Sequence, residues 1–225
     1  MIARSLETLL SHAGVVPLTP VPSTLRVSGI CVDSREVAPG DLFFALRGAK
    51  HDGAMHARQA VERGAVAVVA DSDVPEPGPG APWIRVAEAR LATGLVARDW
   101  FGRPDESMTL VGITGTKGKT TVVYLVESIV RAAGRSAGRI GTVGYAFDRQ
   151  EIQASRTTPE ATALYALLAR MREAGTEIVA MEVSSHALVL HRVAGARFPV
   201  AAFLNLGRDH LEFHGGTEAY FEAKA

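Results

Sequence analysis

The chain has 225 residues, 47% hydrophobic and 21% charged, which is enough to bury a core in one large or two ordinary domains. Lys plus Arg and Asp plus Glu both number 24, and this zero formal net charge argues against binding nucleic acid through bulk positive charge. The single cysteine, Cys31, excludes an internal disulfide framework, and no apolar run reaches the ~20 residues of a membrane helix. We therefore expect a cytoplasmic protein with no membrane, no nucleic acid and no obligate protein partner.

The first hundred residues alternate helical and strand-like segments. Apolar residues recur at helical spacing near the N-terminus, and Gly14 ends this short helix. A Pro-Gly turn and further hydrophobic runs then predict strands over 26–33 and 41–48, a helix over 54–63, strands over 65–70 and 83–86, and a helix over 88–101. Gly-Arg-Pro-Asp over 102–105 breaks the pattern, so we place a boundary there and expect domains over 1–105 and 106–225.

The second domain repeats the order strand, helix, strand, helix, strand. The predicted elements are strands over 108–113, 139–145, 177–183 and 199–206, with helices over 120–133 and 160–174. This order is typical of an α/β fold in which helices wrap a mainly parallel sheet. In such open sheets ligands bind at the carboxyl ends of the strands, so polar residues that follow these strands are candidates for a site.

A glycine-rich turn over 112–121 carries the strongest signal in the sequence, because a strand feeds it and a helix leaves it. Its glycines let backbone N–H groups surround phosphate oxygens, and the helix N-terminus adds further donors. In this interpretation Lys119 neutralises the terminal phosphates of a nucleotide and the Thr120 hydroxyl ligates Mg²⁺. The strict P-loop pattern is not met, since Ile113 stands where its first glycine belongs, and an accidental Gly/Thr-rich turn is the alternative.

Two further strands of this domain end in polar residues. Glu182 closes one of them, and a buried carboxylate there needs a compensating cation, for which Mg²⁺ is a candidate and an arginine the alternative. His210 follows the next strand in a polar cluster and is a second candidate metal ligand. A helix cap explains Ser185 as well as a ligand role does, and His56, on a predicted helix, receives no role.

Taken together, these segments resemble the Mur ligases, and among them the MurE type most closely. In the first domain, CVDSREVAPGDLFFALRG followed by HDG looks like the UDP-binding domain of these enzymes. In the second, GITGTKGKTT, IGTVG, TTPE, MEVSSHAL with HRV, and NLGRDHLEFHG with YFEAK occur in the MurE order. The resemblance runs from about Ser28 to the last residue. It implies a small N-terminal α/β UDP-binding domain, then an incomplete P-loop central domain with a mainly parallel sheet, and no C-terminal domain.

The resemblance also implies roles for residues whose own context does not reveal them. ATP would be held by Thr114, Gly115, Thr116, Lys117, Gly118, Lys119 and Thr120. The UDP part of the substrate would contact Val32, Ser34, Ala49, Lys50 and His51, and the muramoyl-dipeptide would contact Thr157, Thr158, Ser184 and Arg192. Lys224 matches a lysine that the family carries as a carbamate formed with CO₂, although its own context predicts a solvated helix residue. The catalytic residues would be Lys119, Glu182, His210 and Lys224, and the Mg²⁺ ligands Thr120, Glu182, His210 and Lys224.

The implied activity is an ATP-dependent ligase of peptidoglycan synthesis, which adds a diamino acid to UDP-MurNAc-L-Ala-D-Glu through an acyl phosphate. The third amino acid would be meso-diaminopimelate or L-lysine. Because the acceptor pocket of the family lies in its third domain, we expect this chain alone not to catalyse the full reaction. Lys117, Leu190 and Leu204 depart from the family pattern. A MurF-like or other Mur-ligase paralogue, or a non-catalytic ATP- or UDP-sugar-binding module, are the alternatives.

Overall fold

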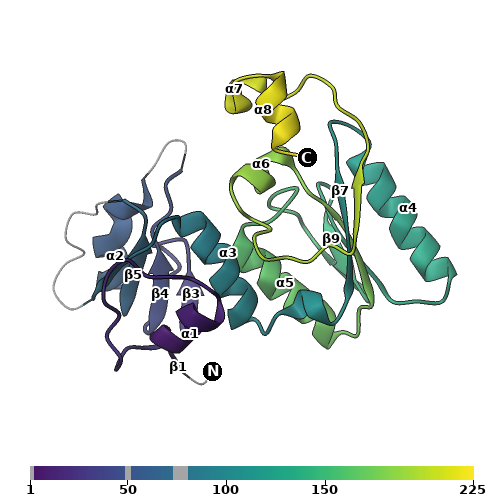
Figure 1. The fold of residues 1–225 in the computed structure, drawn as a ribbon. Helices are drawn as coiled ribbons and strands as arrows, with labels where there is room; N and C mark the ends of the chain where they lie inside the picture. Colours follow the sequence, from purple (N-terminus) through teal and green to yellow (C-terminus); the bar gives the residue numbers. More distant parts are fainter. Residues whose placement is uncertain (1–2, 49–51, 73–80) are drawn as a thin grey trace. The chain divides into compact units, whose positions relative to one another are not determined.

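The computed structural model describes residues 3–48, 52–72 and 81–225. The chain forms two compact units, Met1–Trp100 and Phe101–Ala225, and each has its own sheet with helices packed against it (Figure 1). The predicted α/β class is confirmed in both units, and the mainly parallel sheet predicted for the second domain is confirmed there. Among the described residues, no helix has the length and apolar character needed to cross a membrane.

The first unit is built on four parallel strands in the order β3-β4-β5-β6. Residues 26–33, expected as one strand, divide at Ser28, because β2 pairs with β1 in a separate antiparallel ladder. In chain order the elements are β1 (Arg4–Ser5), α1 (Leu6–His12), β2 (Arg26–Val27), β3 (Gly29–Cys31), β4 (Asp41–Phe44), the 3₁₀ helix η1 (Gly53–His56), α2 (Ala57–Glu62), β5 (Ala67–Ala70), β6 (Trp83–Arg85) and α3 (Ala89–Trp100).

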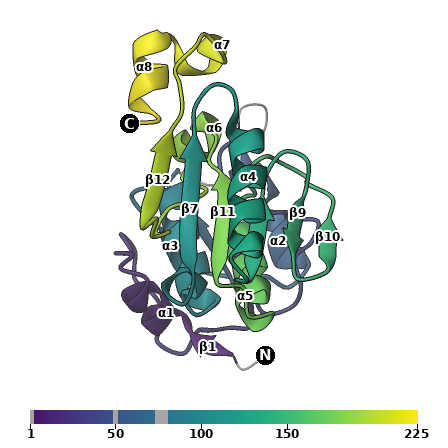
Figure 2. The same ribbon diagram turned by 90° about the vertical axis from the view of Figure 1, so that its right-hand side faces the viewer.

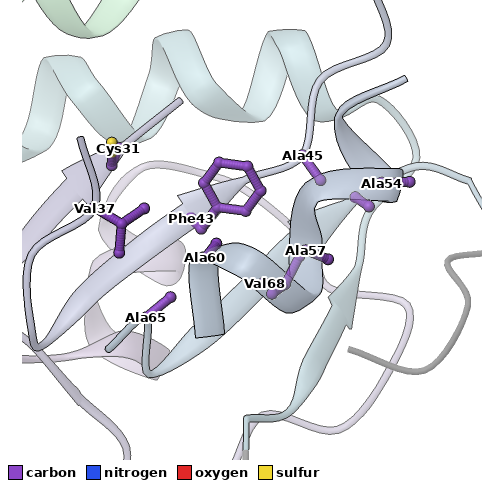
Figure 3. Packing of buried hydrophobic residues seen from close by; sticks show 10 residues of the cluster. Cys31, Val37, Phe43, Ala45, Ala54, Ala57, Ala60, Ala65 and Val68 are labelled. Carbon is purple, nitrogen blue, oxygen red and sulfur yellow. The ribbon is translucent and has the colours of Figure 1, made fainter. Parts of the chain in front are cut away.

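A buried cluster around Phe43 fixes α2 against this sheet (Figure 3). Phe43 of β4 and Val68 of β5 face Ala57 and Ala60, which lie on the buried side of α2. Small side chains on that side let the helix come close to the strands, and burying one Phe side chain contributes about 1.5–3 kcal/mol. The cluster therefore holds η1 and α2 beside the loops that follow β3 and β4.

The second unit has a six-stranded sheet in the order β10-β9-β8-β11-β7-β12. The strands β8, β11, β7 and β12 run parallel, and β7, β11 and β12 are seen side by side in Figure 2. In chain order the elements are the 3₁₀ helix η2 (Pro104–Glu106), β7 (Thr109–Thr114), α4 (Lys119–Ala132), β8 (Ala137–Ile140), β9 (Tyr145–Phe147), β10 (Gln150–Ile152), α5 (Ala161–Glu173), β11 (Ile178–Glu182), α6 (Ser185–Val189), β12 (Val200–Phe203), α7 (Leu211–His214) and α8 (Thr217–Glu222).

The predicted single strand over 139–145 is wrong. The chain leaves the sheet after Ile140, turns through Gly141 and Gly144, and returns as β9, which pairs antiparallel with both β8 and β10. Gly141 permits this turn because a Cβ there would collide with the Glu182 carboxylate. The turn between β9 and β10 places Asp148 at φ 52, a conformation that Asp and Asn tolerate better than most residues.

The helices α4 and α5 cover opposite faces of this sheet (Figure 1, Figure 2). Val123 of α4 packs against Ile113 of β7 and Ala180 of β11 in a buried cluster. Glu127 is also buried on this side of α4, where Arg139 of β8 neutralises it across 3.1 Å between Nη1 and Oε2. These contacts fix the first turn of α4 at the carboxyl ends of β7 and β11, where ligands bind in sheets of this kind.

Candidate functional site

The loop between β7 and α4 has the geometry of a phosphate cradle. Gly115 and Gly118 have φ values of 141° and 86°, which residues with a Cβ rarely adopt. The first N–H groups of a helix have no intrahelical partner, and Gly118, the N-cap of α4, has no side chain that could cap them. Open N–H groups at a helix N-terminus bind anions well, since the helix dipole adds partial positive charge there.

Lys119 supplies a cation to this cradle. Its Nζ donates to the carbonyl oxygens of Gly115 and Thr116 at 2.7 and 3.0 Å, so the side chain folds back over the loop. Burial lowers the pKa of Lys119, and the carboxylates of Glu182 and Asp209 oppose that shift. The ammonium is therefore held above the loop with acidic groups nearby, in a position to meet a phosphate.

Glu182, at the end of β11, faces the start of α4. It is 1% exposed, and its Oε1 accepts from the Thr120 hydroxyl and the Thr142 backbone N–H, both at 2.9 Å. Its Oε2 accepts from the Thr142 hydroxyl at 3.2 Å. All three donors are uncharged, so the arginine partner that was the alternative for Glu182 is not among its hydrogen-bond donors. A charged carboxylate that is buried among neutral groups is stabilised when a cation approaches it.

The oxygen atoms of this group suit Mg²⁺, which prefers hard oxygen ligands and keeps several waters or substrate oxygens in its coordination shell. Thr120 and Glu182 offer a hydroxyl and a carboxylate oxygen side by side. No cluster of three or more His, Cys, Asp or Glu side chains that could hold a metal occurs in the described part of the chain. A metal here would therefore depend on ligands from the nucleotide and solvent as well as on protein.

The predicted dipeptide-binding residues gather around the same strand end. The Thr158 hydroxyl donates to the Glu182 carbonyl at 2.8 Å and accepts from the Ser184 N–H at 3.1 Å. Arg192 donates to the Thr158 carbonyl at 3.3 Å. Thr157 lies 3.0 Å from Thr142, hydroxyl to hydroxyl. Thr158 is fully buried, and its hydroxyl joins Glu182 to Ser184 in the turn after β11.

The structure excludes the helix-cap alternative for Ser185. Ser184, not Ser185, caps α6, because its hydroxyl accepts from the Ala187 N–H at 3.2 Å. Ser185 is buried and lies 3.0 Å from Nε2 of His214. Arg192 forms an ion pair with Glu160 at 2.8 Å. Its guanidinium also donates to the Thr158 carbonyl, and such a planar cation suits a carboxylate ligand.

Lys224 is buried, at 8% exposure, which corrects the solvated helix residue that its own context predicts. It follows α8, and its Nζ donates to Thr114 Oγ1 at 3.4 Å and to the Gly115 carbonyl at 3.2 Å. Burial, and secondly the charge of Lys119, lower its pKa to about 8. A neutral amine beside the phosphate cradle is thus accessible near physiological pH.

His210 lies at the start of α7 with φ 52. Its ring packs edge-on against His186 with 4.7 Å between centroids, and His186 stacks on Phe213 at 4.1 Å. Within the described residues no hydrogen bond joins His210 to Glu182, Thr120 or Lys224, so the structure does not bring the four predicted metal ligands together as one set. Thr120 and Glu182 meet directly, Lys224 touches the loop, and His210 belongs to the neighbouring aromatic cluster.

In the first unit, Val32 and Ser34 line a cavity of about 790 Å³ at the carboxyl ends of β3 and β4. The Ser34 hydroxyl donates to Gln59 Oε1 at 2.7 Å. His56 also lines this cavity, although its position on a helix gave it no predicted role. Gln59 and His56 were missed because only the fold brings η1 and α2 to these strand ends. Ala49, Lys50 and His51, expected to contact uridine, lie outside the described residues.

Comparison with known proteins assigns both units to one family. The profile of the Mur ligase middle domain matches residues 113–225, and the profile of the Mur ligase family catalytic domain matches residues 26–100. The UDP-N-acetylmuramoyl-L-alanyl-D-glutamate–2,6-diaminopimelate ligase of Solibacter usitatus is 50% identical over 208 residues, which are 92% of this chain and 42% of that protein. The chain therefore spans about two fifths of the length of this curated relative.

Solved structures agree with the sequence comparison. A structure of UDP-N-acetylmuramoyl-L-alanyl-D-glutamate–2,6-diaminopimelate ligase matches with a TM-score of 0.81 and 27% identity, over 99% of this chain and 44% of that one. A MurF ligase from Thermotoga maritima in complex with ADP matches with a TM-score of 0.56 and 25% identity, over 88% of this chain and 42% of that one. Since the middle-domain profile alone covers half of its residues, the chain belongs to the Mur ligase family.

Proposed function

We propose that the chain binds ATP and a UDP-linked muramoyl-dipeptide as part of a MurE-type ligase, which adds the third amino acid to UDP-MurNAc-L-Ala-D-Glu. The observation that carries this proposal is the contact between the start of α4 and the end of β11. There the Lys119 ammonium bonds the loop carbonyls, the Thr120 hydroxyl donates to the buried carboxylate of Glu182, and the Glu182 charge acts on Lys119. The names of the similar proteins support diaminopimelate, rather than lysine, as the amino acid that is added.

ATP would lie with its phosphates over the loop from Thr114 to Thr120. The N–H groups at the start of α4 and the Lys119 ammonium would bind the β- and γ-phosphates. The Mur ligase structure that contains ADP supports a nucleotide as the ligand of this loop. When bound, Mg²⁺ would neutralise phosphate charge. Thr120 and Glu182, whose oxygens lie side by side, are the residues that would hold it. His210 and a carbamylated Lys224 stay predicted ligands.

The first unit would bind the UDP part of the substrate in the cavity of Val32 and Ser34. In the second unit, Arg192 would bind the acidic end of the dipeptide, because its guanidinium donates to the Thr158 carbonyl and so lies beside the other residues predicted to bind the dipeptide. Thr157 and Ser184 would orient the same end. Since ATP and the UDP-linked substrate are both cytoplasmic metabolites in this proposal, we expect the reaction to take place in the cytoplasm.

The proposed chemistry has two steps. A carboxylate oxygen of D-Glu attacks the γ-phosphorus of ATP, the bond to the β-phosphate oxygen breaks, and ADP leaves. The amine of the third amino acid then attacks the acyl carbon, loses a proton, and expels phosphate. Both partners of the first step are anions, so the Lys119 charge and the N–H groups of the loop lower the repulsion between them and stabilise the transferring group.

Calorimetric titration of the chain tests this proposal. We expect saturable binding of ATP in the presence of Mg²⁺ and of UDP-MurNAc-L-Ala-D-Glu, and weaker binding of UDP-MurNAc-tripeptide. A preference for the tripeptide would instead indicate a MurF-like paralogue. Binding of ATP with no affinity for either UDP compound would contradict the ligase proposal and leave a nucleotide-binding module.

A further inference from the structure

A side chain outside the phosphate loop bonds both the backbone N–H and the backbone carbonyl of one residue of that loop. The Lys117 N–H donates to Asn205 Oδ1 at 3.0 Å, and Asn205 Nδ2 donates to the Lys117 carbonyl at 3.0 Å. The two residues are 88 positions apart in sequence. Only a carboxamide carries an acceptor and a donor side by side, so only Asn or Gln can satisfy both groups of one residue in this way. Reversing the amide would break both bonds, which fixes its orientation.

The backbone brings Asn205 to this point. The parallel pairing of β12 with β7, visible in Figure 2, continues past the strand ends, because the Leu204 N–H donates to the Thr114 carbonyl at 3.0 Å. The Thr116 N–H in turn donates to the Asn205 carbonyl at 3.0 Å. Gly115 permits this approach, since a Cβ there would lie 3.1 Å from Leu204 Cβ and 3.2 Å from the Asn205 nitrogen.

A second contact from the same side supports the loop at Thr116. The Thr116 hydroxyl accepts from the Gly207 N–H at 2.8 Å and lies 3.1 Å from the Tyr220 hydroxyl, and Tyr220 is 1% exposed. The loop is thus supported at two successive residues by the segment that follows β12. At Lys117 the support acts through the backbone alone, and the exposed Lys117 side chain takes no part in these two hydrogen bonds. A lysine side chain is therefore accommodated at this position.

We propose that Asn205 is a positioning residue for nucleotide binding. Its carboxamide holds the backbone N–H and carbonyl of Lys117, and it thereby fixes the turn through Gly118 that aims the first N–H groups of α4 at the phosphates. The role rests on the proposed function of this loop as an ATP site. Asn205 does not touch the phosphates in this proposal, because both polar atoms of its side chain are engaged by Lys117.

The test compares Asn205→Ala and Asn205→Asp with Leu206→Ala, which alters the adjacent and 42% exposed side chain as a matched control. Three quantities are measured on the whole chain: hydrogen exchange of the Lys117 amide by ¹⁵N NMR, the Kd for ATP and the Kd for adenosine. In Asn205→Ala we expect Lys117 exchange to rise about tenfold and ATP affinity to fall about fivefold, with adenosine affinity unchanged. Leu206→Ala should match the unmodified chain in all three.

Asn205→Asp keeps an acceptor for the Lys117 N–H but sets an oxygen against its carbonyl. Lys117 exchange should stay slow while ATP affinity falls at least as far as in the alanine variant, and this variant decides the matter if Asn205→Ala does not fold. Unchanged Lys117 exchange in Asn205→Ala, or an equal loss of ATP and adenosine affinity, would overturn the positioning role. Failure of the unmodified chain to bind ATP would instead count against the proposed function, because Lys117 exchange reports on the Asn205 contact by itself.

Discussion

Replacing Lys119 with methionine is the sharpest test of the phosphate cradle. Methionine keeps much of the apolar stem but removes the charge that bonds the Gly115 and Thr116 carbonyls at 2.7 and 3.0 Å. In the complex that charge would instead meet phosphate oxygens. A hydrogen bond between charged groups contributes about 1.5–3 kcal/mol, so the ATP affinity should fall about 10- to 150-fold.

The assay is calorimetric titration with ATP at fixed Mg²⁺ and ionic strength. Arg149→Met serves as a charge-matched control, because this exposed residue lies in the turn between β9 and β10 and also loses one positive charge. We expect its ATP affinity to stay within about twofold, since exposed charges contribute about 0–1 kcal/mol. The UDP compound should bind both variants equally well. An ATP affinity of Lys119→Met equal to that of Arg149→Met would refute the assignment of the cradle.

Three further predictions concern the groups around this loop and the first-unit cavity. Glu182→Gln should reduce the gain in ATP affinity on adding Mg²⁺ by about tenfold while leaving Mg²⁺-free binding intact, and an unchanged Mg²⁺ effect would exclude Glu182 as a ligand. The pKa of Lys224 is lowered to about 8, so the amine is protonated below that pH and loses its proton as the pH rises through it. At pH 8 about half of the Lys224 amines are therefore neutral, compared with about 0.3% for an ordinary lysine. With ¹³C-labelled bicarbonate, a carbamate signal that Lys224→Arg abolishes should therefore grow through pH 8, and growth only near pH 10 would contradict the shifted pKa. Gln59→Ala should weaken UDP binding about 2- to 10-fold by freeing the Ser34 hydroxyl, with ATP binding as the internal control, and equal UDP affinity would remove Gln59 from the site.

Local patterns predicted the elements that position the phosphate loop. Hydrophobic runs marked β7 and β11, and Gly134 and Gly175 marked where the chain leaves α4 and α5, because these signals act over neighbouring residues. The antiparallel hairpin of β9 and β10 was missed because each strand has only three residues. The sequence analysis also assigned residues 139–145, which include the turn before β9, to one strand. Short elements give too few repeats for a period to show.

Contacts between distant segments could not be predicted in the same way. Lys224 is polar and lies in a helical context, and only its packing against the loop of Thr114 and Gly115 makes it buried. His56 reaches the cavity of Ser34 because η1 packs at the ends of β3 and β4. The Asn205 carboxamide bonds the Lys117 backbone although the two residues are 88 positions apart in sequence. Each of these depends on strand order, which sequence periodicity does not specify.

The most direct measurement of the central claim is a pair of ¹H–¹⁵N NMR titrations of the chain. With ATP and Mg²⁺, the account predicts that amide shifts concentrate at residues 114–120 and at Glu182. With UDP-MurNAc-L-Ala-D-Glu, shifts should appear at Val32, Ser34 and the residues of η1, and also near Arg192. Shifts from ATP that spare the loop between β7 and α4 would contradict the account, whatever the affinity.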